Sequence, residues 1–160
     1  MTQELQQALV NVGAFSAFGM SAIGSAYGCG VAASSAIGSW KKCYAQGRPV
    51  PFQLTILTGA PMTQTIYGVI LMGQIMALGL TCWPEALIIG LIGGLGICFS
   101  AMFQGRAAAG GCDAFAETGQ GFVNYLIALG IVETIAIFVL AFGIKYIGDV
   151  TKAAAAIAGA

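Results

Sequence analysis

A single carboxylate, Glu133, interrupts the long apolar run between Phe122 and Ile147. Glu133 lies about eleven residues into that run, which at 1.5 Å per residue is about 17 Å along a helix and near the middle of a bilayer. An ionised group at that depth costs several kcal/mol unless it is paired, so an intramembrane carboxylate predicts a functional site. The structural alternative is a permanently protonated Glu133 that holds neighbouring helices together through hydrogen bonds.

Other oxygen-bearing side chains lie at compatible depths in the remaining apolar runs. In the segment APMTQTIYG, Pro61 interrupts a helix, because proline has no N–H to donate and crowds the carbonyl four residues back. Thr63 and Gln64 follow within one turn. Tyr67 lies one turn beyond Thr63, where its phenol could donate a hydrogen bond to a carboxylate. Gln104 is the only uncharged amide in the third apolar run.

These side chains combine neutral oxygen donors with one negative charge. Hard cations prefer oxygen ligands, and a single carboxylate balances a monovalent ion. We therefore expect Glu133, Gln104, Thr63 and Gln64 to hold a monovalent cation, with Na⁺, Li⁺ and H⁺ as the candidates. A proton carrier would need only a carboxyl group in an apolar pocket, so it would leave the neutral ligands without a purpose.

The composition is typical of a membrane protein. Of the 160 residues, 58% are apolar and 8% are charged, whereas a soluble domain carries about 25% charged residues. Four apolar windows predict membrane-spanning helices at roughly 9–38, 52–80, 85–110 and 122–147. The first window lacks a basic start and a clear cleavage site, so we expect it to be retained and not removed as a signal peptide.

The placement of charges predicts an orientation in the cell membrane. Lys41, Lys42 and Arg48 lie between the first two spans, whereas the connection between spans two and three carries Glu85 and neither Lys nor Arg. The positive-inside rule therefore places loops 1–2 and 3–4 in the cytoplasm and both termini outside. Nucleic acid is not an expected partner, because the sequence has no basic patch to bind it.

Two pairs of segments repeat along the chain in the same order. SAYGCGVAASSA at 25–36 aligns with SAMFQGRAAAGG at 100–111, and QTI at 64–66 aligns with ETI at 133–135. Repeats that share one order indicate duplication of a structural unit. Here that unit is a hairpin of two membrane helices.

We therefore predict an all-α membrane protein built from two tandem hairpins in the same orientation. The first hairpin covers residues 1–80 and the second covers residues 81–160. Gln64 then occupies the position of Glu133, so one hairpin carries the carboxylate and the other carries a neutral amide of similar shape.

Glycines are concentrated in spans one and three. The chain has 24 glycines, several of them at the four-residue spacing of Gly24-x-x-x-Gly28 and Gly90-x-x-x-Gly94. This spacing allows helix backbones to approach closely inside a membrane. Spans two and four carry larger apolar side chains, so we expect an inner layer of spans one and three, an outer layer of spans two and four, and a ring of many copies.

The segments APMTQTIYG, FQGRAAAG and VETIAIF, in this order, resemble the proteolipid subunit of V-type ATPases over essentially the whole chain. In particular they are similar to the K (c) subunit of bacterial sodium-pumping V-type enzymes. The resemblance implies a homo-oligomeric rotor ring in lipid, in which each carboxylate carries one ion. It also implies a stator subunit with an essential Arg and a central-stalk subunit that contacts the cytoplasmic loops.

The same resemblance assigns roles to individual positions. In sodium-carrying members, the ligands are the carboxylate, a Gln on span three, a Thr–Gln pair and the backbone carbonyl before that pair. These ligands correspond to Glu133, Gln104, Thr63, Gln64 and the carbonyl of Ala60. The tyrosine that donates a hydrogen bond to the family's carboxylate corresponds to Tyr67.

The resemblance implies ion transport coupled to ATP hydrolysis in partner subunits. Hydrolysis by this chain is not expected, because the segment GRAAAGG lacks the Lys of a phosphate-binding loop. A rotor that carries H⁺ is the nearest alternative. A small cation-coupled exporter is a second, but it would need a substrate cavity lined by aromatic residues around the carboxylate, and such proteins often have inverted repeats. A purely structural or pore-forming oligomer would not need Glu133.

Overall fold

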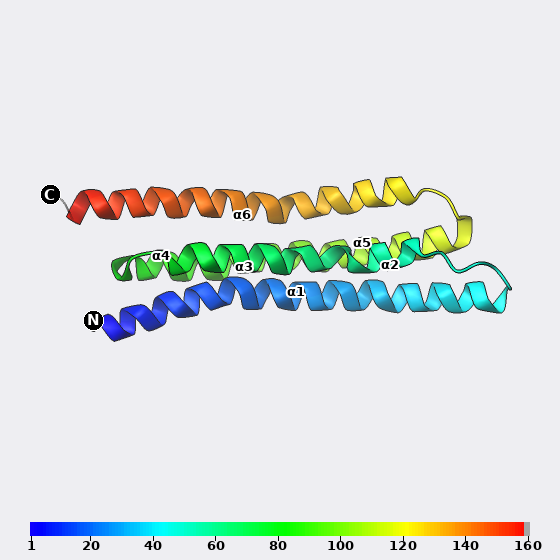
Figure 1. Cartoon of the computed structure of the whole chain (residues 1–160), viewed down its shortest axis with the longest axis horizontal. Helices are drawn as coiled ribbons and strands as arrows, with labels where there is room; N and C mark the ends of the chain where they lie inside the picture. Colours follow the sequence, from blue (N-terminus) through cyan, green and yellow to red (C-terminus); the bar gives the residue numbers. More distant parts are fainter. Residues whose placement is uncertain (159–160) are drawn as a thin grey trace.

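The computed structural model describes residues 1–158 and arranges them as helical rods that lie side by side (Figure 1). The first rod is α1, Gln3–Ala45, and the last is α6, Phe122–Ala158. The second rod comprises α2 (Gln53–Gly59), η1 (Ala60–Met62) and α3 (Thr63–Met76). The third rod comprises η2 (Leu80–Cys82), α4 (Trp83–Ile88), η3 (Ile89–Gly93) and α5 (Gly94–Thr118). Residues 159–160 of the predicted second hairpin lie outside the described residues.

Within residues 1–158, four helical stretches are long and apolar enough to cross a membrane. They are Gln3–Ala45, Gln53–Met76, Leu80–Thr118 and Phe122–Ile157. The predicted all-α, multi-pass membrane architecture is therefore confirmed. The two connections predicted to share one side of the membrane lie together at one end of the bundle (Figure 1). The orientation of the bundle and the boundary between a first and a second hairpin stay predictions.

Three helices continue beyond the apolar windows that predicted them, which ran over roughly 9–38, 85–110 and 122–147. Two of the helices end instead at Ala45 and Thr118, and the third is helical through Ala158, the last residue that the structure describes. Hydropathy marks the thickness of the bilayer, whereas a helix ends where its backbone hydrogen bonds end. After α5, Gly119 adopts a φ of 64° and its N–H bonds to the Phe115 carbonyl, which closes the helix with a left-handed residue.

The second span is shorter than expected. The apolar window predicts a span over roughly 52–80. In the structure α3 ends at Met76, and residues 77–79 turn the chain into the third rod. Gly79 has extended backbone at this turn, with a φ of −65° and a ψ of 156°. The apolar pattern continues through the turn, so hydropathy did not mark it.

The backbones of α1 and α5 are in direct contact. A Cβ atom on Gly105 would lie 2.2 Å from Cα of Gly28, and one on Gly24 would lie 2.4 Å from the carbonyl oxygen of Cys98. Real Cβ atoms cannot approach that closely, so these positions admit only glycine without a shift of the backbone. The predicted close approach of spans one and three is confirmed.

The third rod also contains a π-turn, η3, that the sequence did not predict. The turn includes Gly90, where a Cβ atom would lie 1.9 Å from the carbonyl oxygen of Gly13 on α1. A π-turn widens the helix locally and rotates the side chains that follow. In this chain the π-turn η3 lies where the backbones of the first and third rods are in contact.

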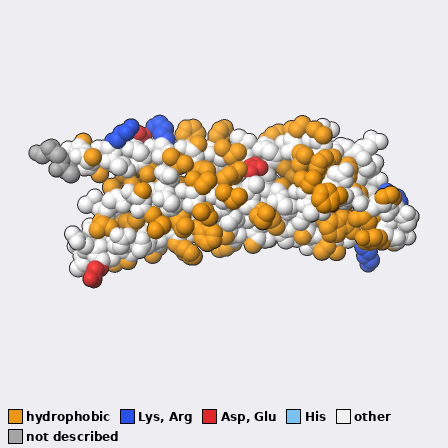
Figure 2. All heavy atoms as spheres, in the orientation of Figure 1, with side chains coloured by type: hydrophobic (Ala, Val, Ile, Leu, Met, Phe, Trp, Pro, Cys, Tyr) orange, Lys and Arg blue, Asp and Glu red, His pale blue; other side chains and the backbone are white. Residues whose placement is uncertain are grey.

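The fourth rod is the most exposed of the apolar helices. In its apolar window 11% of the residues are buried, compared with 39% in the window of α1. Figure 2 shows apolar side chains over much of the visible face, charged side chains mainly near the two ends, and one acidic patch midway. An apolar helix that is this exposed in one copy needs lipid or further copies to cover it.

We predict that Gly105→Ala lowers the thermal stability of the purified protein. The added methyl group would press α5 against the backbone of α1, and overpacking of this kind costs about 1–3 kcal/mol. The measurement is loss of helical circular dichroism on heating in detergent.

Gly110→Ala is the matched control on the same helix, because a Cβ atom on Gly110 meets nothing within 4 Å. The close-packing interpretation is wrong if the two variants lose their helical signal at the same temperature.

Candidate functional site

The site begins at a break in the second rod. The turn η1, Ala60–Met62, separates α2 from α3 and contains the buried Pro61. Proline cannot donate the hydrogen bond that would continue α2, so the helix tightens into a 3₁₀ turn at this point. The break places the carbonyl of Ala60 3.2 Å from the hydroxyl oxygen of Thr63, at the start of α3.

The carboxylate of Glu133 accepts hydrogen bonds from two other helices. Its Oε1 atom accepts from the Thr63 hydroxyl at 2.6 Å and from the Tyr67 phenol at 2.7 Å, both on α3. Its Oε2 atom accepts from Nε2 of Gln104 on α5 at 3.2 Å. Both carboxylate oxygens therefore have donors, which suits an ionised group in an apolar setting.

Two glutamine side chains form the buried wall of the site. Gln64 is 0% exposed and Gln104 is 1% exposed. Nε2 of Gln64 donates to Oε1 of Gln104 at 2.7 Å, and Nε2 of Gln104 also donates to the Leu129 carbonyl at 3.1 Å. These bonds fix both amide planes. They leave Oε1 of Gln64 turned toward the Thr63 hydroxyl, 3.2 Å away.

The Thr63 hydroxyl has more acceptor oxygens within reach than it has hydrogens. The Thr63 hydroxyl lies within 3.2 Å of three acceptors: the carbonyl of Ala60, Oε1 of Gln64 and Oε1 of Glu133. A hydroxyl carries one hydrogen and can satisfy one of them. Oxygens that face one another without a hydrogen between them are stabilised by a cation.

The charge of the cluster is that of one carboxylate. Across the part of the chain that the structure describes, no group of three or more His, Cys, Asp or Glu side chains is placed to hold a metal ion. Divalent ions bound by protein oxygens usually have several anionic ligands. The side chains that donate to Glu133 add no second negative charge to the cluster.

The structure brings the predicted site residues together from three rods. Each makes a hydrogen bond within the cluster or forms the helix break beside it: Ala60, Pro61, Thr63, Gln64, Tyr67, Gln104 and Glu133. Their roles as ion ligands stay predictions. Arg106, two residues beyond Gln104, does not join them, and its Nη2 atom bonds instead to the Tyr27 hydroxyl at 3.3 Å.

Sequence reasoning missed three contributors. The carbonyl of Leu129 accepts from Gln104, and the carbonyl of Val132 accepts from the Ser100 hydroxyl at 2.9 Å. The side chains of Leu129 and Val132 give no indication that their carbonyls take part. Ser100 could have been noticed, because it opens the repeated segment SAMFQGRAAAGG.

Comparison with known proteins finds one family model that matches part of the chain. A family model for the C subunit of ATP synthase matches residues 87–145. The match includes Gln104 and Glu133, and it ends before the C-terminal turns of α6. No curated protein matches the chain.

We predict that Tyr67→Phe speeds the modification of Glu133 by a hydrophobic carbodiimide about two- to tenfold. The aromatic ring would remain, but Oε1 would lose one of its two donors, and one hydrogen bond is worth about 0.5–1.5 kcal/mol. Mass spectrometry of the modified peptide gives the rate.

Tyr146→Phe provides the control, because Tyr146 is an exposed residue of the same helix as Glu133. Equal rates in wild type and Tyr67→Phe would show that the phenol does not restrain the carboxylate.

Proposed function

We propose that this chain forms the membrane rotor of a sodium-translocating V-type ATPase. Its residues 87–145 match the family of ATP synthase C subunits, which are the ion-carrying rotor subunits of rotary ATPases. Each copy would carry one Na⁺ across the membrane. The observation that carries the choice of ion is the surplus of acceptor oxygens around the Thr63 hydroxyl.

The proposed ligands are neutral oxygens and one carboxylate from three rods. They are the Glu133 carboxylate, the Thr63 hydroxyl, the amide oxygens of Gln64 and Gln104, and the carbonyl of Ala60. The amide oxygen of Gln104 already accepts from Gln64, but a carbonyl oxygen has two lone pairs and can accept a hydrogen bond while it binds a cation. Tyr67 orients the carboxylate and is not itself a ligand.

A bound Na⁺ would explain the presence of more of the oxygen-bearing groups near Glu133 than a bound H⁺ would. A proton on Glu133 would neutralise the charge without help from Gln64, Gln104 or the carbonyl of Ala60. Two fully buried amides are costly to keep in an apolar bundle unless their polar atoms are used. Li⁺ has the same charge and ligand preference as Na⁺, so it is an expected substitute.

The proposed transport cycle depends on the balance of charge in lipid. With Na⁺ bound, the net charge of the site is zero, and the ring can turn through the hydrocarbon layer at little electrostatic cost. At the stator, an Arg of the partner subunit would compete with the ion for Glu133 and release it. ATP hydrolysis in other partner subunits would drive the rotation through a central stalk that contacts loops 1–2 and 3–4, which we place in the cytoplasm.

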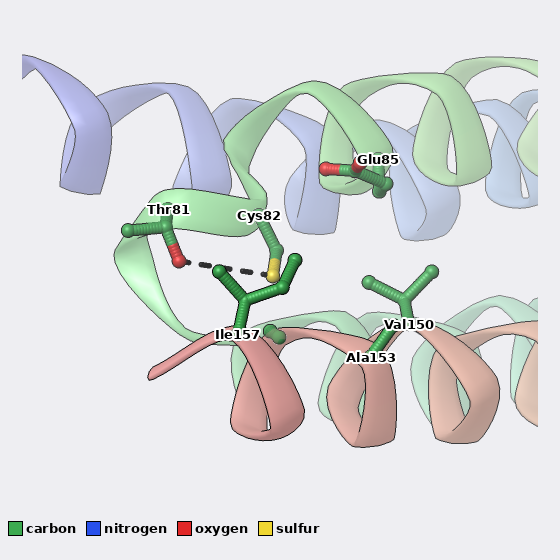
Figure 3. Close-up of a pocket in the computed structure, with 7 residues that line it drawn as sticks. Thr81, Cys82, Glu85, Val150, Ala153 and Ile157 are labelled. Atoms are coloured by element: carbon green, nitrogen blue, oxygen red, sulfur yellow. Dashed lines mark hydrogen bonds between the residues drawn. The ribbon is translucent and has the colours of Figure 1, made fainter. Parts of the chain in front are cut away.

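The exporter alternative receives little support from the cavities of the bundle. The cavity in Figure 3 has a volume of about 380 Å³ and is lined by residues of η2, α4 and the last turns of α6, including Thr81, Glu85 and Ile157. Glu133 is not among its lining residues. The side chains that donate hydrogen bonds to Glu133 are those of Thr63, Tyr67 and Gln104.

We predict that millimolar NaCl protects Glu133 from carbodiimide at fixed pH in the purified ring, because a bound ion occupies the carboxylate. LiCl should protect at higher concentration and KCl should not protect. The rate is measured by mass spectrometry at constant ionic strength. Modification that responds to pH and ignores Na⁺ would overturn the sodium assignment and favour H⁺.

We predict that Glu133→Gln abolishes ATP-driven ²²Na⁺ uptake into vesicles while the ring still assembles. The amide has nearly the same shape and can still accept the Thr63 and Tyr67 hydrogen bonds, but it cannot balance the charge of the ion. Gel mobility of the ring in mild detergent reports assembly. Uptake by a Glu133→Gln ring would rule out Glu133 as the carrier.

A further inference from the structure

We infer that Ser100 is a positioning residue for the ion-carrying carboxylate. Its hydroxyl donates to the carbonyl of Val132 at 2.9 Å. That carbonyl belongs to the peptide group that joins Val132 to Glu133, so the bond holds the backbone at the point where the carboxylate side chain begins. The inference rests on the proposed function, because it concerns how Glu133 is presented to the ion.

Ser100 acts together with Gln104, one turn further along α5. Gln104 donates to the carbonyl of Leu129, three residues before Val132 on α6. Residues three apart lie on the same face of a helix. Two side chains of α5 therefore bind two carbonyls on one face of α6 and fix the rotation of that helix about its own axis.

The rotation of α6 matters because Glu133 reaches the cluster only when its face of the helix is turned toward α3 and α5. The helix is largely exposed, with Ile131 68% exposed and Ile135 56% exposed on either side of Glu133. A side chain tip lies about 5–6 Å from the helix axis, so a rotation of about 20° would move the carboxylate by ~2 Å. Binding groups must be held to about 0.5 Å, so such a rotation would take Glu133 out of the cluster.

Ser100 differs from Gln104 in what it touches. Gln104 bonds to the carboxylate itself as well as to the backbone, whereas the hydrogen bond of Ser100 goes to the backbone. Ser100 is 5% exposed, and its substitution would leave every proposed ligand in place. Its contribution can therefore be separated from ion ligation.

The first half of the chain supplies an internal comparison. Ser25 aligns with Ser100 in the repeated segment, and the carboxylate position of that half is held by Gln64. The Ser25 hydroxyl is buried, and among the residues that the structure describes it has no hydrogen-bond partner. The bond to the backbone thus occurs in the half that carries the carboxylate and is missing in the half that does not.

The test compares Ser100→Ala with Ser100→Thr, which retains a hydroxyl, in intact purified rings. Two quantities are measured: the NaCl concentration that halves carbodiimide modification of Glu133, and the maximal rate of ATP-driven ²²Na⁺ uptake. Ser100→Ala should raise the half-protecting concentration about three- to tenfold, the worth of one hydrogen bond. The maximal rate at saturating Na⁺ should change less than twofold, and Ser100→Thr should restore the wild-type concentration.

Two serine variants serve as controls. Ser35→Ala removes a hydroxyl-to-carbonyl bond of the same kind, from Ser35 to Ala109 at 2.7 Å, which joins α1 to α5 and not α5 to α6. Ser25→Ala removes the aligned serine, which makes no such bond within the described residues. Both should retain the wild-type half-protecting concentration.

The inference is overturned if Ser100→Ala binds Na⁺ like these controls, if Ser100→Thr is as impaired as Ser100→Ala, or if Ser100→Ala fails to assemble. Failure of the sodium assignment would be distinguishable, because Na⁺ would then not protect the wild type either. In that event the modification rate in Na⁺-free buffer decides the role of Ser100. We expect that rate to be higher in Ser100→Ala, because a less firmly held carboxylate leaves the cluster more often.

Discussion

Glu133 has to be stabilised in the middle of an apolar helix, and the arrangement of the bundle follows from that requirement. A carboxylate in an apolar helix is costly unless hydrogen bonds and a counter-charge replace its hydration. Thr63 and Tyr67 on α3 donate to one of its oxygens and Gln104 on α5 donates to the other. The second and third rods must therefore both approach α6 at the height of the carboxylate.

The rest of the fold makes this approach possible. Glycines let α1 and α5 pack backbone against backbone, which leaves α3 and α5 close enough to share α6 as a neighbour. Pro61 breaks the second rod beside the site, so a main-chain oxygen from Ala60 reaches the Thr63 hydroxyl. The same break would be destabilising in an ordinary helix, but here the displaced carbonyl joins a polar cluster that can use it.

Asymmetry between the two halves of the chain gives the site its charge. The half that carries Gln64 supplies neutral oxygens, and the half that carries Glu133 supplies the one anion. A second carboxylate at position 64 would place two negative charges next to each other in an apolar bundle, and one monovalent ion would not balance both. One carboxylate among neutral oxygens is the composition that a single monovalent cation can neutralise.

The sequence by itself determined the fold class and most members of the hydrogen-bonded cluster around Glu133, because polar residues within apolar helices are conspicuous and their depth follows from counting. Glu133, Gln104, Thr63, Gln64 and Tyr67 were all predicted in this way or by family resemblance. The tertiary structure decided which atoms meet. Main-chain carbonyls such as those of Leu129 and Val132 are present at every residue, so only the packing of α5 against α6 shows which of them accept a hydrogen bond. The π-turn and the C-terminal ends of α1, α3 and α5 were likewise set by backbone contacts and turns, which hydropathy does not record.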